Sequence, residues 1–182
     1  MPTYNEKPMP NNVKLLFFIF LLLCGGAPQK ASSQSLHGIK GLPPYERAVL
    51  IIKHYEGWHT KKDYPYIGYG HQIQPGENLR YPITETQADS LLRSDLTKLC
   101  AMFRKYEADS LLLACIAYNC GPARLLGDGK RTPKSRLLRK LDQGNRDIFA
   151  ECLTFCRYKG RPIPSIRRRR WVEFHLLFNP CL

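Results

Sequence analysis

Residues 54–71, HYEGWHTKKDYPYIGYGH, change character within a few positions. The pattern is helical up to Glu56, and tyrosine, glycine and proline replace it from Gly57 onward. A glycine directly after Glu56 ends the helix and exposes its last carboxylate to the segment that follows. Asp63 comes seven positions later, and the stretch closes on IGYGH. The stretch therefore predicts a helix end, tight turns and two neighbouring carboxylates.

Helical patterns lie on both sides of this stretch. Residues 42–55 begin with two prolines and carry apolar residues on one face. Thr84 and Gln87 form a capping box that opens a long helix. Residues 110–119, SLLLACIAYN, are apolar nearly all round, which predicts a helix in the middle of a bundle. Further helices are expected after Ser135, from Asn145 to Tyr158, and from Pro164 onward.

The segment from Trp58 to Tyr81 shows no helical period and predicts a short antiparallel sheet with glycine turns. Because the sheet is set apart from the helices, the expected fold class is α+β, with a small sheet lobe and a larger helical lobe. A cleft between two such lobes would accommodate a polymer. With 182 residues the chain is long enough for one main core, so one folded domain is expected.

Residues 1–34 have the layout of a signal peptide or an amino-terminal anchor. Two lysines precede an apolar run from Leu15 to Leu23, which is shorter than a membrane span of about 20 residues. Cleavage after Ser33, lipidation of Cys24 and retention as an anchor all remain open. The expected localisation is the periplasm or cell envelope, with membrane contact only through this segment. The folded domain is then expected to span residues 35–182.

The chain is strongly basic, with a formal net charge of +13. Residues 1–34 contain three lysines and one glutamate, so the remainder carries +11. Such a surface favours a polyanionic partner: nucleic acid, an anionic membrane or the bacterial wall. Export favours the last two.

Six cysteines remain when Cys24 is set aside. They allow three disulfides in 15 connectivities, or they are free buried thiols. Their spacing does not resemble a zinc site, so no metal is expected. They are Cys100, Cys115, Cys120, Cys152, Cys156 and Cys181.

The two carboxylates have surroundings that suit glycoside hydrolysis. Cleavage of a glycosidic bond needs a protonated carboxylic acid beside the leaving oxygen and a second carboxylate opposite it. Glu56 has aromatic neighbours, which favour its neutral form, whereas Asp63 follows two lysines and is expected to stay ionised.

With these residues the chain resembles the phage-type lysozymes, glycoside hydrolase family 24. That family has a glutamate, an aspartate or cysteine after eight residues, a threonine after five more, and then Ile-Gly-Tyr-Gly-His. Further blocks of the family are similar in the same order, and together the blocks cover nearly all of residues 43–178. The resemblance is closest to lysozyme-like proteins encoded by conjugative elements of Bacteroidota. The matching blocks are residues 56–57, 67–71, 118–121, 135–144 and 159–173.

The spacing departs from the family motif. Counted from Glu56, the family's aspartate falls on Pro65 and its threonine on His71, so five residues are missing before the IGYGH turn. Alignment on that turn instead places Tyr66 where the family has threonine. Asp63 is then the only acid in the shortened hairpin, but it is out of register.

The resemblance implies roles for particular residues. Glu56 would be the general acid. Asp63 is either the second carboxylate or a surface residue of the hairpin, and Tyr66 either orients the attacking water or packs. One arginine of the run at 167–170 would pair with the catalytic acid, and the register leaves open which.

The resemblance also implies residues that contact substrate. Tyr118 and Asn119 would line the cleft, where the amide could bond a sugar's acetamido group, although a helix-terminal asparagine is also a common cap. His71 lies near the expected site, and in the family its counterpart supports the sheet.

The function implied is that of a lysozyme-like peptidoglycan hydrolase. It would be an N-acetylmuramidase without metal or cofactor that cuts the β-1,4 bond after N-acetylmuramic acid and opens the wall locally, with peptidoglycan and a conjugative transfer apparatus as partners. The alternative is an inactive peptidoglycan-binding scaffold of that apparatus with a lysozyme fold. No nucleic-acid-binding motif accompanies the arginine run, so nucleic acid is not an expected partner.

Overall fold

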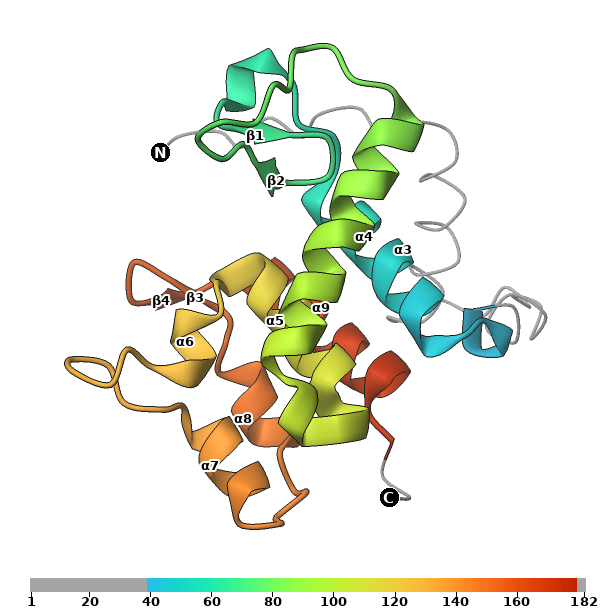
Figure 1. Ribbon diagram of the computed structural model, residues 1–182. Coiled ribbons are helices and arrows are strands. Elements are labelled where there is room, and N and C mark those ends of the chain that lie inside the picture. The colour runs from blue at the N-terminus through green and yellow to red at the C-terminus, as the bar shows by residue number, and fades with distance from the viewer. Residues whose placement is uncertain (1–38, 180–182) are drawn as a thin grey trace. The chain divides into compact units, whose positions relative to one another are not determined.

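The computed structural model describes residues 39–179 (Figure 1). The predicted signal peptide or anchor, residues 1–34, lies outside this range and stays a prediction. Contacts divide the chain after Leu42, and every labelled element belongs to the unit that begins at Pro43. Among residues 39–179, no helix combines the length and the apolar character needed to cross a membrane.

Within the described part of this unit, helices predominate and four very short strands accompany them. In chain order the elements are α3 (Pro44–Glu56), the 3-10 turn η1 (Lys61–Asp63), β1 (Tyr66–Ile67), β2 (His71–Gln72), α4 (Glu85–Met102), the 3-10 turn η2 (Arg104–Asp109), α5 (Ser110–Cys120), α6 (Ala123–Leu126), α7 (Arg136–Asp142), α8 (Phe149–Leu153), β3 (Arg157–Tyr158), β4 (Arg161–Pro162) and α9 (Pro164–Leu177). The predicted α+β class is confirmed.

The first sheet is narrower than the sequence predicts for Trp58–Tyr81. Strands β1 and β2 are antiparallel, with Tyr66 opposite Gln72 and Ile67 opposite His71. A single bridge between His59 and Gly68 extends the pairing. Figure 1 shows this hairpin at one end of α4 and the helices α5–α9 toward the other end. The long helix α4 therefore connects the small lobe to the helical lobe.

Helix α4 begins as its sequence predicts. The Thr84 hydroxyl accepts a hydrogen bond from the Gln87 N–H at 3.2 Å, and the Gln87 side chain accepts one from the Thr84 N–H at 2.8 Å. This reciprocal cap satisfies two backbone donors that the first turn of a helix leaves unpaired.

Helix α5 forms the centre of the core. Its residues 112–117 are all buried, and α3, α4 and α9 pack around it. Each leucine buried in this way contributes about 1.5–3 kcal/mol of hydrophobic stabilisation. The apolar run at 110–119 is therefore a central helix, as predicted.

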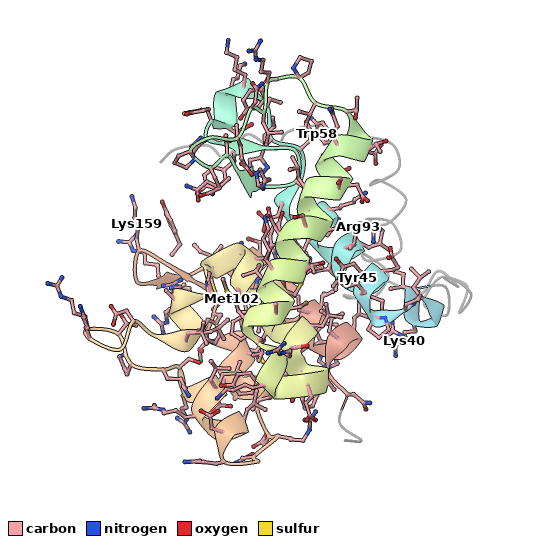
Figure 2. All side chains as sticks on the ribbon, in the orientation of Figure 1. Lys40, Tyr45, Trp58, Arg93, Met102 and Lys159 are labelled. Carbon is pink, nitrogen blue, oxygen red and sulfur yellow. The ribbon has the colours of Figure 1, made fainter. Side chains whose placement is uncertain are left out.

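The predicted helix from Asn145 to Tyr158 is wrong for most of its length. Helix α8 covers only Phe149–Leu153, and the β3–β4 hairpin follows it. Lys159 and Gly160 form the two-residue turn of this hairpin, and both have positive φ angles, 47° and 78°. Positive φ at both turn positions suits the right-handed twist of paired strands. Lys159 projects from the turn into solvent (Figure 2).

The cysteines in the described part of the chain carry free thiols. Cys115 and Cys152 are fully buried, and Cys156 is nearly so. These five thiols therefore form no disulfide within residues 39–179. Cys181 lies outside the described residues. The five free thiols are those of Cys100, Cys115, Cys120, Cys152 and Cys156.

Candidate active site

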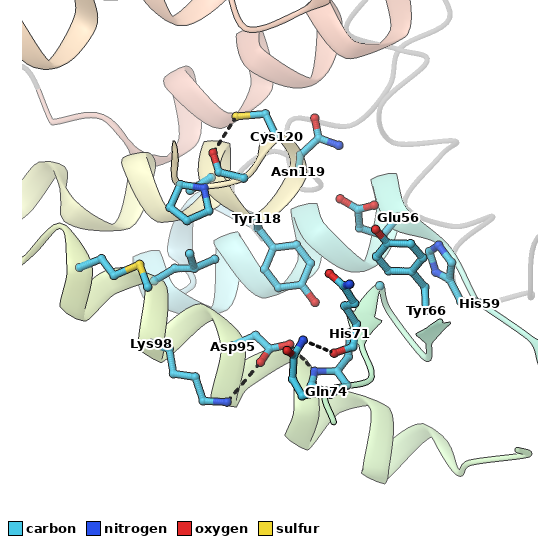
Figure 3. Close-up of a pocket in the computed structure, with 17 residues that line it drawn as sticks. Glu56, His59, Tyr66, His71, Gln74, Asp95, Lys98, Tyr118, Asn119 and Cys120 are labelled. Carbon is cyan, nitrogen blue, oxygen red and sulfur yellow. Dashed lines mark hydrogen bonds and ion pairs between the residues drawn. The ribbon is translucent and has the colours of Figure 1, made fainter. Parts of the chain in front are cut away.

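A cleft of about 730 Å³ is lined by the end of α3, the β1–β2 hairpin, α4 and the end of α5 (Figure 3). It brings together five of the six residues that the sequence singles out. They are Glu56, Tyr66, His71, Tyr118 and Asn119. Asp63 does not line this cleft.

Glu56 is the last residue of α3. Gly57 follows with a φ of 67°, and its N–H donates to the Lys53 carbonyl, which closes the helix. The IGYGH turn lies directly against the acid: a Cβ on Gly70 would sit 3.6 Å from Glu56 Cγ and 3.7 Å from the Tyr118 ring. Because Gly70 has a φ of 92°, the turn is suited to glycine. The backbone of the turn at Gly70 therefore packs against the side chains of both Glu56 and Tyr118.

A buried ion-pair network lies behind Glu56. Arg169 Nη1 donates to Glu56 Oε1 at 2.6 Å, and Arg169 Nε donates to Glu173 Oε1 at 2.8 Å. Arg170 Nε lies 3.1 Å from Glu173 Oε2. The side chains of Arg169, Arg170 and Glu173 are 3%, 0% and 0% exposed, and that of Glu56 is 18% exposed. The catalytic candidate is the only member of the network that reaches the cleft solvent appreciably.

The network identifies which arginine pairs with the acid. Arg169 pairs with Glu56. Arg170, the next residue of α9, instead donates hydrogen bonds to two acceptors of α5, the Ile116 carbonyl and Asn119 Oδ1. The other two arginines of the run are exposed. Burial alone would lower the pKa of Arg169, but the charges of Glu173 and Glu56 raise it above its ordinary value. Arg169 therefore stays charged and divides its charge between two carboxylates.

Asp63 is engaged by its own turn. Its Oδ2 accepts hydrogen bonds from the Thr60 N–H at 2.7 Å and from the Thr60 hydroxyl at 3.1 Å. The carboxylate thus caps η1. The pattern threonine, two residues, aspartate is itself a capping signature, so the sequence contained this signal.

Tyr66 lines the cleft and is 42% exposed. The Tyr81 hydroxyl donates to the Tyr66 carbonyl at 2.6 Å, which fixes the strand next to the acid. A phenol hydroxyl can donate and accept hydrogen bonds, so it can hold a water or a sugar hydroxyl.

Tyr118 and Asn119 lie at the other wall, at the end of α5. The Tyr118 hydroxyl donates to the Tyr69 carbonyl at 3.0 Å. Burial, with the nearby charges of Asp95 and Glu56, raises the pKa of Tyr118, so it stays a neutral phenol. Asn119 Oδ1 already accepts from Arg170 at 3.1 Å. The Asn119 NH₂ group is therefore the part of this amide that can donate to a ligand.

His71 is 4% exposed and links the hairpin to α4. Its Nδ1 lies 2.6 Å from Asp95 Oδ2, and its Nε2 lies 2.9 Å from Glu77 Oε2. Burial alone would lower the pKa of His71, but hydrogen bonds to these two carboxylates and their charges raise it. Both ring nitrogens are occupied, so this histidine supports the sheet next to the cleft.

The cleft also contains residues that sequence reasoning missed. His59, Asp95 and Lys98 line it, and none belongs to a motif of the sequence. Asp95 is bound by His71 and lies 3.5 Å from Lys98. Among residues 39–179, no group of three or more histidine, cysteine, aspartate or glutamate side chains is arranged to hold a metal ion.

The family model for phage lysozyme matches residues 53–173, well over half of the chain. The match begins three residues before Glu56 and ends at Glu173, so it includes the cleft and the buried network. None of the curated proteins compared with the chain matches it.

Proposed function

Since the chain belongs to the phage lysozyme family, whose members are glycoside hydrolases of the muramidase type, we propose that it cleaves the β-1,4 bond between N-acetylmuramic acid and N-acetylglucosamine in peptidoglycan. Glu56 is the proton donor in this proposal. The observation that carries it is the position of Glu56, which faces the cleft from a helix end and is held by a buried arginine.

The two oxygens of Glu56 have different tasks. Oε1 accepts the hydrogen bond from Arg169 at 2.6 Å. Oε2 has no hydrogen-bond partner within the described residues and is the oxygen that carries the transferred proton. A carboxyl fixed through one oxygen presents the other in a defined direction, which favours proton transfer to a glycosidic oxygen.

Glu173 supports this role from behind. A guanidinium shared by two carboxylates attracts each of them less strongly than a guanidinium paired with one. Because Glu173 bonds the same guanidinium at 2.8 Å, Arg169 is partly neutralised and orients the acid at less electrostatic cost.

In the reaction, Glu56 gives its proton to the leaving oxygen as the bond from that oxygen to the anomeric carbon breaks. A water adds to the carbon, its excess proton passes to solvent, and Glu56 is protonated again. We propose that Tyr66 orients this water, because its side chain lines the cleft while the Asp63 carboxylate is bound by Thr60. Asn119 would donate its NH₂ group to a sugar acetamido oxygen.

The cellular role that we propose is local opening of the wall by an exported enzyme. The signal-like layout of residues 1–34 supports export, and the net charge of +11 on the rest of the chain favours attachment to an anionic wall. The resemblance to proteins of conjugative elements favours a transfer apparatus as the setting.

The test is digestion of purified peptidoglycan by the full chain, with mass analysis of the products. A muramidase leaves N-acetylmuramic acid at the new reducing ends. Glu56→Gln is expected to lower the rate by about 10²–10⁴-fold, the usual contribution of a general acid. Glu46→Gln is the matched control, because Glu46 lies at the start of the same helix and is paired with Arg93 on the outside. Equal rates for the two variants would remove Glu56 from the mechanism.

One observation favours a second candidate function, a wall-binding scaffold without activity. The Asp63 carboxylate is engaged in its turn, so no second carboxylate of the hairpin faces the cleft. A wild-type chain that binds peptidoglycan tightly and releases no reducing sugar would establish the scaffold and exclude the hydrolase.

A further inference from the structure

His59 lies three residues after Glu56 and lines the same cleft. Three residues of chain span at most about 11 Å, so its backbone stays close to the acid. The His59 N–H donates to the Gly68 carbonyl at 2.7 Å, and its ring centroid lies 6.0 Å from that of Tyr66. Figure 3 shows His59 and Tyr66 at the end of the cleft that holds Glu56, with Lys98 at the opposite end.

The two ring nitrogens of His59 have different surroundings. Nδ1 is buried and has no hydrogen-bond partner among the residues that the structure describes. Nε2 also makes no hydrogen bond within residues 39–179, but unlike Nδ1 it is not fully buried. Nδ1 is thus isolated from ligand, and Nε2 is the nitrogen that a ligand can reach.

These surroundings determine where the proton of the neutral ring sits. Neutral imidazole carries one N–H and one lone pair. A buried N–H without an acceptor is rarer in proteins than a buried acceptor without a donor. The proton therefore belongs on Nε2, and Nδ1 keeps its lone pair. In this tautomer His59 is a hydrogen-bond donor toward the cleft and cannot accept a proton from water at Nε2.

We infer that His59 is a substrate-positioning residue whose Nε2–H donates to an oxygen of the sugar bound beside Glu56. The inference rests on the proposed function and specifies its substrate contact: the partner is a hydroxyl or acetamido oxygen of a saccharide. A donor fixed by the backbone next to the acid holds the sugar ring so that the glycosidic oxygen meets Glu56 Oε2. The nearby Tyr66 ring adds an aromatic surface to the same subsite.

The test uses the full chain with Glu56→Gln, which prevents cleavage, and soluble oligomers of the N-acetylglucosamine–N-acetylmuramic acid repeat. His59→Gln and His59→Asn are matched variants, because the glutamine amide nitrogen can replace Nε2 and the asparagine amide nitrogen can replace only Nδ1. Titration calorimetry is expected to show a Kd about tenfold weaker for His59→Asn and within about threefold of the parent for His59→Gln. His59→Phe, which keeps a ring beside Tyr66 and lacks a donor, is expected to behave like His59→Asn.

The possible results separate the inference from the proposed function. Equal affinity for all three variants would overturn the inference. So would a second pattern, measured in the chain with intact Glu56, in which both amide variants keep the Kd and lose kcat a hundredfold or more, because that pattern indicates that His59 is a base. The expected binding order in a chain that never cleaves peptidoglycan would keep the His59 contact and refute the hydrolase alone. Thermal unfolding of each variant checks that the fold is retained.

Discussion

Glu173→Gln tests whether the buried charges of Arg169 and Arg170 depend on the charge of Glu173. Glu173 is fully buried and balances two arginines, at 2.8 Å from Arg169 Nε and 3.1 Å from Arg170 Nε. Without its charge, Arg169 keeps the Glu56 carboxylate as a partner, and the buried Arg170 keeps only neutral acceptors, the Ile116 carbonyl and Asn119 Oδ1. At about 4 Å and an effective dielectric constant of about 20, one such attraction is worth about 4 kcal/mol. Loss of one partner of a buried pair costs about 3–5 kcal/mol.

This loss is large on the scale of folding stability, which is about 5–15 kcal/mol. With a urea dependence of about 2 kcal/mol per molar, the unfolding midpoint of Glu173→Gln is expected to fall by about 1.5–2.5 M. Glu46→Gln serves as the control. Glu46 and Arg93 also form a short pair, at 2.7 Å, but their side chains are 40% and 36% exposed. Loss of this exposed ion pair should lower the unfolding free energy by no more than about 1 kcal/mol, which corresponds to about 0.5 M in the urea midpoint.

A second substitution separates charge imbalance from loss of a hydrogen bond. Adding Arg170→Met to Glu173→Gln removes one charge of each sign and keeps a similar side-chain volume. If charge imbalance dominates, the urea unfolding midpoint of the double variant regains at least half of the decrease that Glu173→Gln causes alone. Urea titrations followed by circular dichroism provide all the values. A Glu173→Gln midpoint within 0.5 M of the wild type would show that the buried charges do not depend on one another, and the reasoning would be wrong.

Two further predictions concern the hairpin. Gly68→Ala should lower the unfolding free energy by about 2–5 kcal/mol, because Gly68 has a φ of 61° and an added Cβ would lie 2.7 Å from Ala88 Cβ. Gly76→Ala, with a φ of 91° and no atom within 4 Å of the added Cβ, should cost only about 1–2 kcal/mol in the same urea titration, and equal losses would contradict the close contact. For His71→Gln, the stability lost relative to the wild type should be greatest between pH 4.5 and 6.5. Because the pKa of His71 is raised in the folded protein, the stability that its ion pairs contribute is lost as the pH rises through that folded pKa. Because the pKa of Glu77 is lowered, the stability from the His71–Glu77 pair is also lost as the pH falls through the folded pKa of Glu77. Unfolding titrations at pH 5.5 and pH 9 measure this, and a larger loss at pH 9 would reverse the assignment.

Local signals predicted the elements that hold the acid. Two prolines begin α3 and Gly57 ends it, so Glu56 could be placed at a helix end from sequence. The capping box at Thr84 fixed the start of α4, and the unbroken apolar run fixed α5 as the central helix. Each of these signals involves residues within about one helical turn of each other, which is why sequence reasoning found them.

The arrangement around Arg169 could not be predicted in this way. Glu56 and Arg169 are 113 positions apart, and adjacent arginines on a helix point in different directions. Both Arg169 and Arg170 are nevertheless buried, because α9 packs against both α3 and α5 and places one arginine on each. The helix expected up to Tyr158 failed for another reason. A two-residue turn with positive φ at Lys159 and Gly160 made a hairpin more favourable than continuing a short helix.

The shortened hairpin decides which chemistry the cleft can support. Glu56 and Asp95 are the carboxylates among the residues that line it, and Asp95 is held by His71 at 2.6 Å. Asp63 has been diverted into a turn cap, so the positive charge that develops on the sugar meets no free carboxylate across from the acid. In the proposed mechanism the side chains of Tyr66, Asn119 and His59 then hold the water and the sugar. The proposed hydrolysis then depends on how precisely Glu56 is positioned, and the hydrogen bond from Arg169 at 2.6 Å fixes the direction of its carboxyl group.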